Sequence, residues 1–271
     1  MTTTGHMTVS YTTSRDGTEI GYFTSGDGPP LVLVHGALGD HTRWDILGPH
    51  LEPHVTIHAM DRRGRGASGD STDYDMSREV EDVTAVVDAV AAISGTAVDV
   101  LGSSAGASFA VAAATQTTNI RRLVLFEPPD RQVLELLPTE LLDQLDALLA
   151  ADDREGLLRL AYRTLVGLSD EEIDKLRAQP AWPNRLAAAH TVPRELRSPP
   201  ERMFDERQVA SVAVPALVLL GAATPPPFQA SARAFVDTLP DARIAVLDGQ
   251  GHAAEMFAPE IVAQRVISFL A

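Results

Sequence analysis

The sequence predicts an α/β protein with a mostly parallel, doubly wound sheet of eight strands and an inserted helical cap. Two observations predict this class. Short apolar runs alternate with amphipathic helical patterns over residues 31–126, as is typical of strands buried on both faces by helices. This alternation stops after Pro129 and resumes near Val214. We therefore expect a core of residues 7–129 and 209–271, with a helical cap over residues 130–208.

The strands are predicted from polarity and from the turns between them. Alternating polarity on either side of Asp16-Gly17 indicates an antiparallel hairpin of residues 9–14 and 18–24. Apolar runs predict buried strands at residues 31–34, 55–60, 123–126 and 214–220, and further strands are expected at residues 98–101 and 243–247. Most of these runs are connected by helical patterns, which favours right-handed crossovers and parallel pairing.

The helices are predicted from apolar residues at helical spacing. Val80, Val83, Val87 and Val90 indicate a long helix with one face on the sheet, while Arg78, Glu79, Glu81 and Asp82 lie on its polar face. Further core helices are expected near residues 44–47, after Ser104, and at residues 228–239 and 260–270. The cap is expected to contain helices at residues 134–149, 154–165 and 169–177, followed by a stretch that prolines interrupt.

Composition excludes several classes of function. The 271 residues carry a net charge of -15 and a pI near 4.8, which argues against nucleic acid as a partner. Because the chain has no cysteine, a disulfide, a thiolate zinc site and a cysteine nucleophile are excluded. No apolar run is long enough to span a membrane, and residues 1–6 are interpreted as a tail or a cloning remnant. We expect a cytoplasmic protein that does not bind membranes, and a homodimer is compatible with the sequence.

The sequence Gly102-Ser103-Ser104-Ala105-Gly106 follows an apolar run and precedes an alanine-rich helical pattern. A Gly-x-Ser-x-Gly sequence between a strand and a helix is typical of a sharp turn that exposes a nucleophilic serine. The alternative is a serine that only caps a helix, as many serine-containing turns do. Ser104 is therefore the candidate nucleophile.

Other strand ends supply candidate partners for Ser104. A serine hydroxyl needs a base to take its proton and a carboxylate to orient that base. His252 lies in a glycine-rich loop after the last strand and suits the base, while Glu127 ends the strand after Ser104. Asp130 remains the alternative acid, and the alternative interpretation of Glu127 is a carboxylate that only caps a turn.

The sequence His35-Gly36-Ala37 follows the first buried strand. A tetrahedral intermediate places negative charge on one oxygen, which two backbone N–H groups can stabilise. We expect these N–H groups to come from Ala37 and Ala105. His35 itself is expected to shape the turn, and Asp61, with the neighbouring arginines, is expected to hold loop geometry near the site.

Together these segments resemble the α/β-hydrolase superfamily. The matching sequences are LVLVHGALGD, MDRRGRGASG, VLGSSAGASF, LVLFEPP, LVLLGAATPPP and LDGQGHAAE. The resemblance implies a Ser-His-acid site under a variable cap, rarely with a cofactor, and we expect neither a cofactor nor a metal here. Most members carry the acid in the turn that here reads Gly221-Ala222-Ala223-Thr224-Pro225-Pro226, which has no carboxylate. Zearalenone lactonases are similar in placing a glutamate after the next strand, which favours Glu127.

These features predict a cofactor-independent serine hydrolase that cleaves an apolar carboxylic ester or lactone through an acyl-enzyme. Trp44, Trp182, Met203, Phe204 and Phe228 are candidate pocket residues. Other chemistry on the same residues is an alternative: a cofactor-free haloperoxidase or perhydrolase, a carbon–carbon bond hydrolase or a biosynthetic cyclase. A non-catalytic small-molecule receptor on the same fold is a further alternative.

Overall fold

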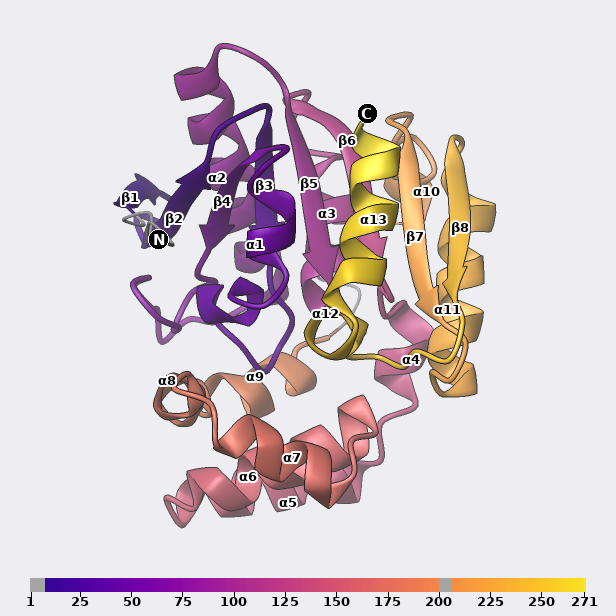
Figure 1. Cartoon of the computed structure of the whole chain (residues 1–271). Helices are drawn as coiled ribbons and strands as arrows, with labels where there is room; N and C mark the ends of the chain where they lie inside the picture. The colour runs from indigo at the N-terminus through magenta and orange to yellow at the C-terminus, as the bar shows by residue number, and fades with distance from the viewer. Residues whose placement is uncertain (1–7, 200–205) are drawn as a thin grey trace, which may run out of the picture.

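The computed structural model describes residues 8–199 and 206–271, and within them an eight-stranded sheet with helices on both faces (Figure 1). The strand order is β1-β2-β4-β3-β5-β6-β7-β8. Strand β2 pairs antiparallel with both β1 and β4, and all other pairs are parallel. The strands are β1 (Thr8–Thr13), β2 (Glu19–Gly26), β3 (Pro30–Val34), β4 (Thr56–Met60), β5 (Val98–Ser103), β6 (Ile120–Phe126), β7 (Ala216–Gly221) and β8 (Ala242–Leu247).

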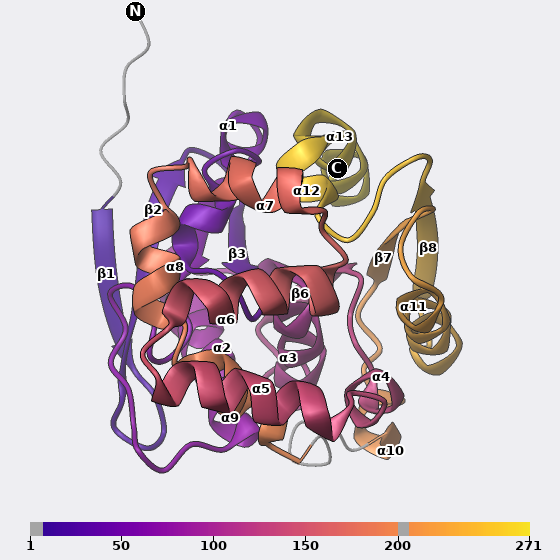
Figure 2. The same ribbon diagram turned by 90° about the horizontal axis from the view of Figure 1, so that it is seen from below.

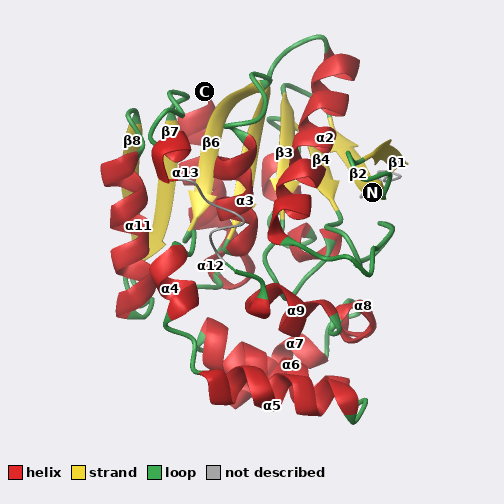
Figure 3. Ribbon diagram, turned by 180° about the vertical axis from the view of Figure 1, so that it is seen from behind, coloured by secondary structure: helices red, strands yellow, loops and turns green. Residues whose placement is uncertain are grey.

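Two apolar layers enclose the sheet. One face packs against α2 (Met76–Ser94), α3 (Ala105–Ala113) and α11 (Pro226–Thr238). The other packs against η1 (His41–Trp44), α1 (Gly48–Leu51), α12 (Ala254–Phe257) and α13 (Pro259–Leu270). Figure 3 shows α2, α3 and α11 together on the face that is hidden in Figure 1. The central strands are therefore buried on both sides, as their continuous apolar runs predict.

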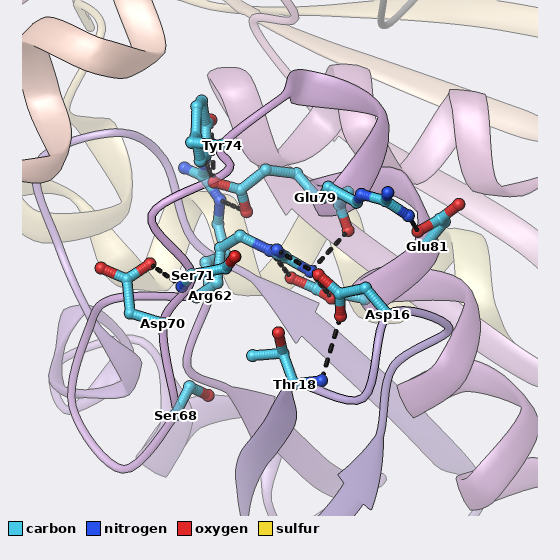
Figure 4. Close-up of polar contacts among 12 residues, drawn as sticks. Asp16, Thr18, Arg62, Ser68, Asp70, Ser71, Tyr74, Glu79 and Glu81 are labelled. Atoms are coloured by element: carbon cyan, nitrogen blue, oxygen red, sulfur yellow. Dashed lines mark hydrogen bonds and ion pairs between the residues drawn. The ribbon is translucent and has the colours of Figure 1, made fainter.

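Helix α2 differs from its predicted form on its polar side. Its four predicted inward valines are buried, and Asp75 and Gly95 cap its two ends. Glu79 and Asp82 are also fully buried. They pair with Arg62 and Arg63 of the turn after β4, and Figure 4 shows Arg62 and Glu79 within this cluster. A charge can be buried when it is paired and hydrogen-bonded in this way.

The segment between β6 and β7 is helical in the part that the structure describes. It contains α4 (Arg131–Glu135), α5 (Thr139–Ala150), α6 (Arg154–Ala161), the π-helix η2 (Tyr162–Val166), α7 (Asp170–Arg177), α8 (Trp182–Ala188), α9 (Thr191–Arg197) and α10 (Glu206–Val209). The predicted helix over residues 134–149 is wrong as one element, because it is divided where Pro138 precedes α5. The predicted helix over residues 154–165 changes to a π-helix at Tyr162.

Helices α5 to α9 lie across the carboxyl ends of the parallel strands (Figure 2). Their apolar side chains form a third cluster, which includes Leu38, Ala253 and Met256 of the core. The Tyr162 hydroxyl donates to the Leu38 carbonyl at 2.9 Å. These helices therefore pack directly over the loops that follow β3 and β8. No helix among the described residues has the length and apolar character that crossing a bilayer requires.

Candidate active site

Ser104 lies at a sharp turn between β5 and α3. Its backbone has φ 51° and ψ -126°, a left-handed conformation that non-glycine residues rarely adopt. The flanking glycines permit this turn. A Cβ on Gly102 would lie 2.4 Å from Ala107 Cα, and one on Gly106 would lie 2.3 Å from the Val34 carbonyl oxygen. The turn therefore needs glycine at both positions, as the sequence pattern indicates.

His252 reaches Ser104 from the loop after β8. Its Nε2 lies 3.1 Å from Ser104 Oγ, and its Nδ1 lies 2.5 Å from Glu127 Oε2. The ring is buried and lies beside Phe228, with 4.6 Å between the ring centroids. Because the carboxylate can only accept, Nδ1 donates to Glu127, which leaves Nε2 free to accept from the serine hydroxyl.

Glu127 is held by the turn after β7, where most members of the superfamily carry the acid and this chain has no carboxylate. It is fully buried and has a positive φ of 46°. Its Oε1 accepts from the backbone N–H of Gly221 at 2.6 Å and from the Thr224 hydroxyl at 2.5 Å. The end of β7 and the turn after it thus donate hydrogen bonds to the carboxylate of the residue that follows β6.

The alternative acid, Asp130, lies elsewhere. The Asp130 carboxylate accepts from the Val133 backbone N–H at 2.9 Å, which caps the start of α4. Asp248 is exposed on the loop before His252. Glu127 is therefore the carboxylate that the structure brings to His252.

The predicted oxyanion donors lie beside the serine. Ala37 and Ala105 both line the cavity that contains Ser104 and His252. Among the described residues, neither backbone N–H donates to a protein acceptor. Gly36 allows the Ala37 loop to approach, because a Cβ at Gly36 would lie 3.1 Å from Ser104 Cβ. Two backbone N–H groups without a protein acceptor therefore belong to residues that line the cavity together with Ser104.

The cavity at Ser104 has a volume of about 80 Å³. Most of its wall is apolar and comes from both the core and the helices between β6 and β7: Leu38, Met76, Phe109, Pro129, Val133, Leu137, Leu165, Val166, Leu196 and Phe228. Phe228 is the predicted pocket residue that this wall contains. Arg43 and Glu195 add charged groups that the sequence analysis did not single out.

Two predicted pocket residues are placed elsewhere. Trp44 packs in the apolar layer between the sheet and α13, and it borders a separate cavity with His41 and Asp45. Trp182 packs among the helices between β6 and β7, stacked on Tyr162 with 6.3 Å between ring centroids. Both predictions are wrong because these indoles fill apolar cores. Met203 and Phe204 lie outside the described residues.

A buried ion pair lies beneath the serine turn. Glu255 accepts from the Ser103 hydroxyl at 2.5 Å and from Arg43 Nη2 at 2.6 Å. Burial opposes ionisation of Glu255, but the Arg43 charge and these hydrogen bonds outweigh it and lower the pKa of the carboxyl. Arg43 thereby remains paired where it borders the cavity.

His35 and Asp61 take structural positions near the site. His35 Nδ1 donates to the Gly36 carbonyl at 2.7 Å, and its Nε2 accepts from the Arg62 N–H at 3.1 Å. Burial and the nearby charges of Arg62 and Arg65 hold the pKa of His35 well below its usual range. Asp61 accepts from the backbone N–H groups of His41 and Ala67, both at 2.7 Å.

Within the described residues, one group of side chains has metal-ligand spacing: Asp40, His41 and Asp61. His41 Nδ1 already donates to Asp61 at 2.9 Å. Burial disfavours the charged imidazole, but the hydrogen bond and charge of Asp61 outweigh this and raise the pKa of His41. The hydrogen bond to Asp61 therefore already uses one ring nitrogen of His41.

The fold and the serine turn define the class of protein. A mostly parallel eight-stranded sheet, flanked by helices and carrying a Gly-x-Ser-x-Gly turn after its central strand, is the α/β-hydrolase fold. The sequence matches the model of the alpha/beta hydrolase family over residues 31–265. The chain belongs to this family.

Known relatives agree with this assignment. The solved structure of an alpha/beta hydrolase from Sphaerobacter thermophilus has a TM-score of 0.81 and 34% identity, covering 97% of this chain and all of that chain. The pimeloyl-(acyl-carrier protein) methyl ester esterase of Xanthomonas campestris is 28% identical over 251 residues, covering 91% of this chain and 96% of the esterase. The N-formylmaleamate deformylase of Pseudomonas putida is 35% identical over 107 residues, which are 38% of this chain and 39% of the deformylase. The match thus spans less than half of the deformylase. The relatives that match over most of their length include an esterase.

Proposed function

We propose that this protein is a serine hydrolase that cleaves carboxylic esters, lactones included, with Ser104 as nucleophile, His252 as base and Glu127 as orienting acid. The observation that carries the proposal is the continuous hydrogen-bonded chain from Ser104 Oγ through the His252 ring to Glu127. Similarity to an esterase over nearly the whole chain supports the choice of an ester. Similarity to zearalenone lactonases in the position of the glutamate supports the inclusion of lactones.

The proposed reaction has two stages. His252 Nε2 takes the hydroxyl proton as Ser104 Oγ attacks the acyl carbon, and the carbonyl oxygen becomes an oxyanion near the Ala37 and Ala105 N–H groups. The tetrahedral intermediate collapses when His252 returns the proton to the departing alkoxide, which leaves an acyl-serine. Water then repeats the sequence, with His252 taking its proton, and releases the carboxylic acid and the free serine.

Helices α5 to α9 form a cap in this proposal. They supply Leu165, Val166 and Leu196 to the cavity wall, opposite the core residues Phe109 and Phe228. An apolar wall stabilises an apolar acyl or alcohol group through burial.

A panel of aryl esters and macrolactones tests this proposal. Wild-type protein is expected to hydrolyse at least one ester, and Ser104→Ala is expected to lower the rate by about 10³-fold or more. The neighbouring Ser103→Ala is the matched control, because the Ser103 hydroxyl contacts Glu255 and not His252. Equal rates for wild type and Ser104→Ala would refute the proposed nucleophile. Binding without turnover would favour a receptor instead.

A further inference from the structure

Among the described residues, one carboxylate lines the cavity besides the groups of the proposed reaction. Glu195 lies on α9, in the helical segment that covers the strand ends, and borders the same cavity as Ser104 and His252. Only 2% of Glu195 is exposed. An ionised carboxylate in a mostly apolar wall costs free energy unless its oxygens are paired, so the partners of each oxygen decide what this group does.

The two oxygens of Glu195 have different surroundings. Oε2 accepts from Arg62 Nη2 at 2.8 Å and from Arg65 Nη2 at 2.5 Å. Oε1 accepts no hydrogen bond from any of the described residues, and protein atoms do not enclose it completely. It therefore keeps accessible surface, and the cavity is the space that Glu195 borders.

The surrounding charges are balanced without a ligand. Arg62 and Arg65 also contact Glu79, which lies on α2 behind them and does not line the cavity. Figure 4 shows Arg62 and Glu79 in this cluster. Two guanidinium groups therefore face two carboxylates. Glu195 therefore has cationic partners within the protein, and its Oε1 remains an acceptor for a neutral donor.

We propose that Glu195 forms a hydrogen-bond-accepting subsite, so that the preferred substrates are esters with a neutral O–H or N–H donor on the acyl group. This inference rests on the proposed esterase function. A substrate with the donor completes the hydrogen bonding of Oε1. An apolar isostere removes Oε1 from solvent but offers it no hydrogen-bond donor. We expect a preference of about 10- to 100-fold, because unpaired buried acceptors cost this much in comparable sites.

The substitution Glu195→Gln gives a directional test. Arg62 and Arg65 are donors only, so the amide oxygen of glutamine is expected to face them. The amide NH₂ then faces the cavity, and the acceptor becomes a donor. Glu79→Gln is the matched control, because it removes a carboxylate from the same two arginines but leaves the cavity wall unchanged.

The substrates are p-nitrophenyl 3-hydroxybutanoate and its apolar isostere p-nitrophenyl 3-methylbutanoate. Each kcat/KM is divided by the rate of alkaline hydrolysis of the same ester, which removes their intrinsic difference in reactivity. Wild type and Glu79→Gln are expected to favour the hydroxy ester by about 10- to 100-fold. Glu195→Gln is expected to lose this preference. A wild-type ratio near one, an unchanged ratio in Glu195→Gln, or an equal loss in Glu79→Gln would overturn the subsite.

Binding of the two esters to Ser104→Ala, measured by calorimetry, separates this inference from the proposed function. A binding preference for the hydroxy ester without turnover by wild type would refute the hydrolase and support the subsite. Turnover of both esters with no preference in rate or binding would support the hydrolase and refute the subsite.

Discussion

Glu127 Oε2 lies 2.5 Å from His252 Nδ1, although 125 residues separate the two side chains. The turn after β7 makes this contact possible, since Gly221 and Thr224 donate to the other carboxylate oxygen and fix its orientation. The carboxylate is therefore supplied by the residue after β6, and the end of the neighbouring strand β7 contributes only hydrogen-bond donors.

This arrangement predicts the effect of Glu127→Gln. Gly221 and Thr224 are expected to hold the glutamine carbonyl, so its NH₂ faces His252 Nδ1 and favours the wrong tautomer. We expect kcat on an activated ester to fall by about 10³- to 10⁴-fold, as such a tautomer change does in a serine protease. Asp130→Asn is the control and is expected to stay within about threefold of wild type. Full activity of Glu127→Gln would contradict the assigned acid.

Removal of a buried arginine is expected to destabilise the fold. Arg63 is fully buried and pairs with Asp82 and Asp16. Even beside Arg63, burial raises the pKa of Asp82 to about 6. Arg63→Met leaves this carboxylate unpaired, so the free energy of unfolding is expected to fall by about 3–5 kcal/mol in urea denaturation.

The exposed pair of Arg163 and Asp170 provides the comparison. Arg163→Met is expected to change the free energy of unfolding by less than about 1 kcal/mol. Equal losses for Arg63→Met and Arg163→Met would contradict the account of the buried pair.

His58 predicts a dependence of stability on pH. Burial lowers the pKa of His58 from 6.5 to about 4. Between these values the unfolded chain binds a proton that the folded protein excludes, so stability falls as pH falls. His58→Gln is expected to reduce this loss by about 1–2 kcal/mol. Urea denaturation of both proteins from pH 7.5 to pH 4.5 measures the difference, and parallel curves would contradict it.

The glycine after the serine turn predicts a steric effect. A Cβ at Gly106 would lie 2.3 Å from the Val34 carbonyl oxygen, and this backbone atom cannot move aside easily. Gly106→Ala is expected to destabilise the protein by about 3 kcal/mol or more. Gly95→Ala meets no atom within 4 Å and has only its positive φ to oppose it, so its expected cost is about 1 kcal/mol. A smaller loss for Gly106→Ala than for Gly95→Ala in thermal unfolding would refute this explanation.

The positions of the strands and the meeting of Ser104 with His252 could be predicted because each depends on a local pattern. Apolar runs mark buried strands, and strand ends carry the reactive groups. Glu127 and Asp130 could not be separated in this way, since both follow β6 and only the packing of β7 decides between them.

The residues of the cavity wall could not be predicted from the sequence, because tertiary packing determines which side chains line it. Trp44 and Trp182 have large aromatic side chains, as pocket residues often do, but neighbouring apolar side chains enclose both in cores. Glu195 lies on a short polar helix and carries no local signal of its own, because its role comes from Arg62 and Arg65, 130 or more residues away in sequence. Similarly, the periodicity of α2 locates its apolar face but cannot show that Glu79 is buried.

Reaction with a fluorophosphonate, followed by peptide mass spectrometry, shows whether Ser104 is the nucleophile. We expect a single adduct on Ser104, lost in Ser104→Ala and retained in Ser103→Ala. Glu127→Gln is expected to slow its formation along with ester hydrolysis. An unmodified Ser104 in a protein that still hydrolyses esters, or labelling that persists in Ser104→Ala at the wild-type rate, would contradict the account.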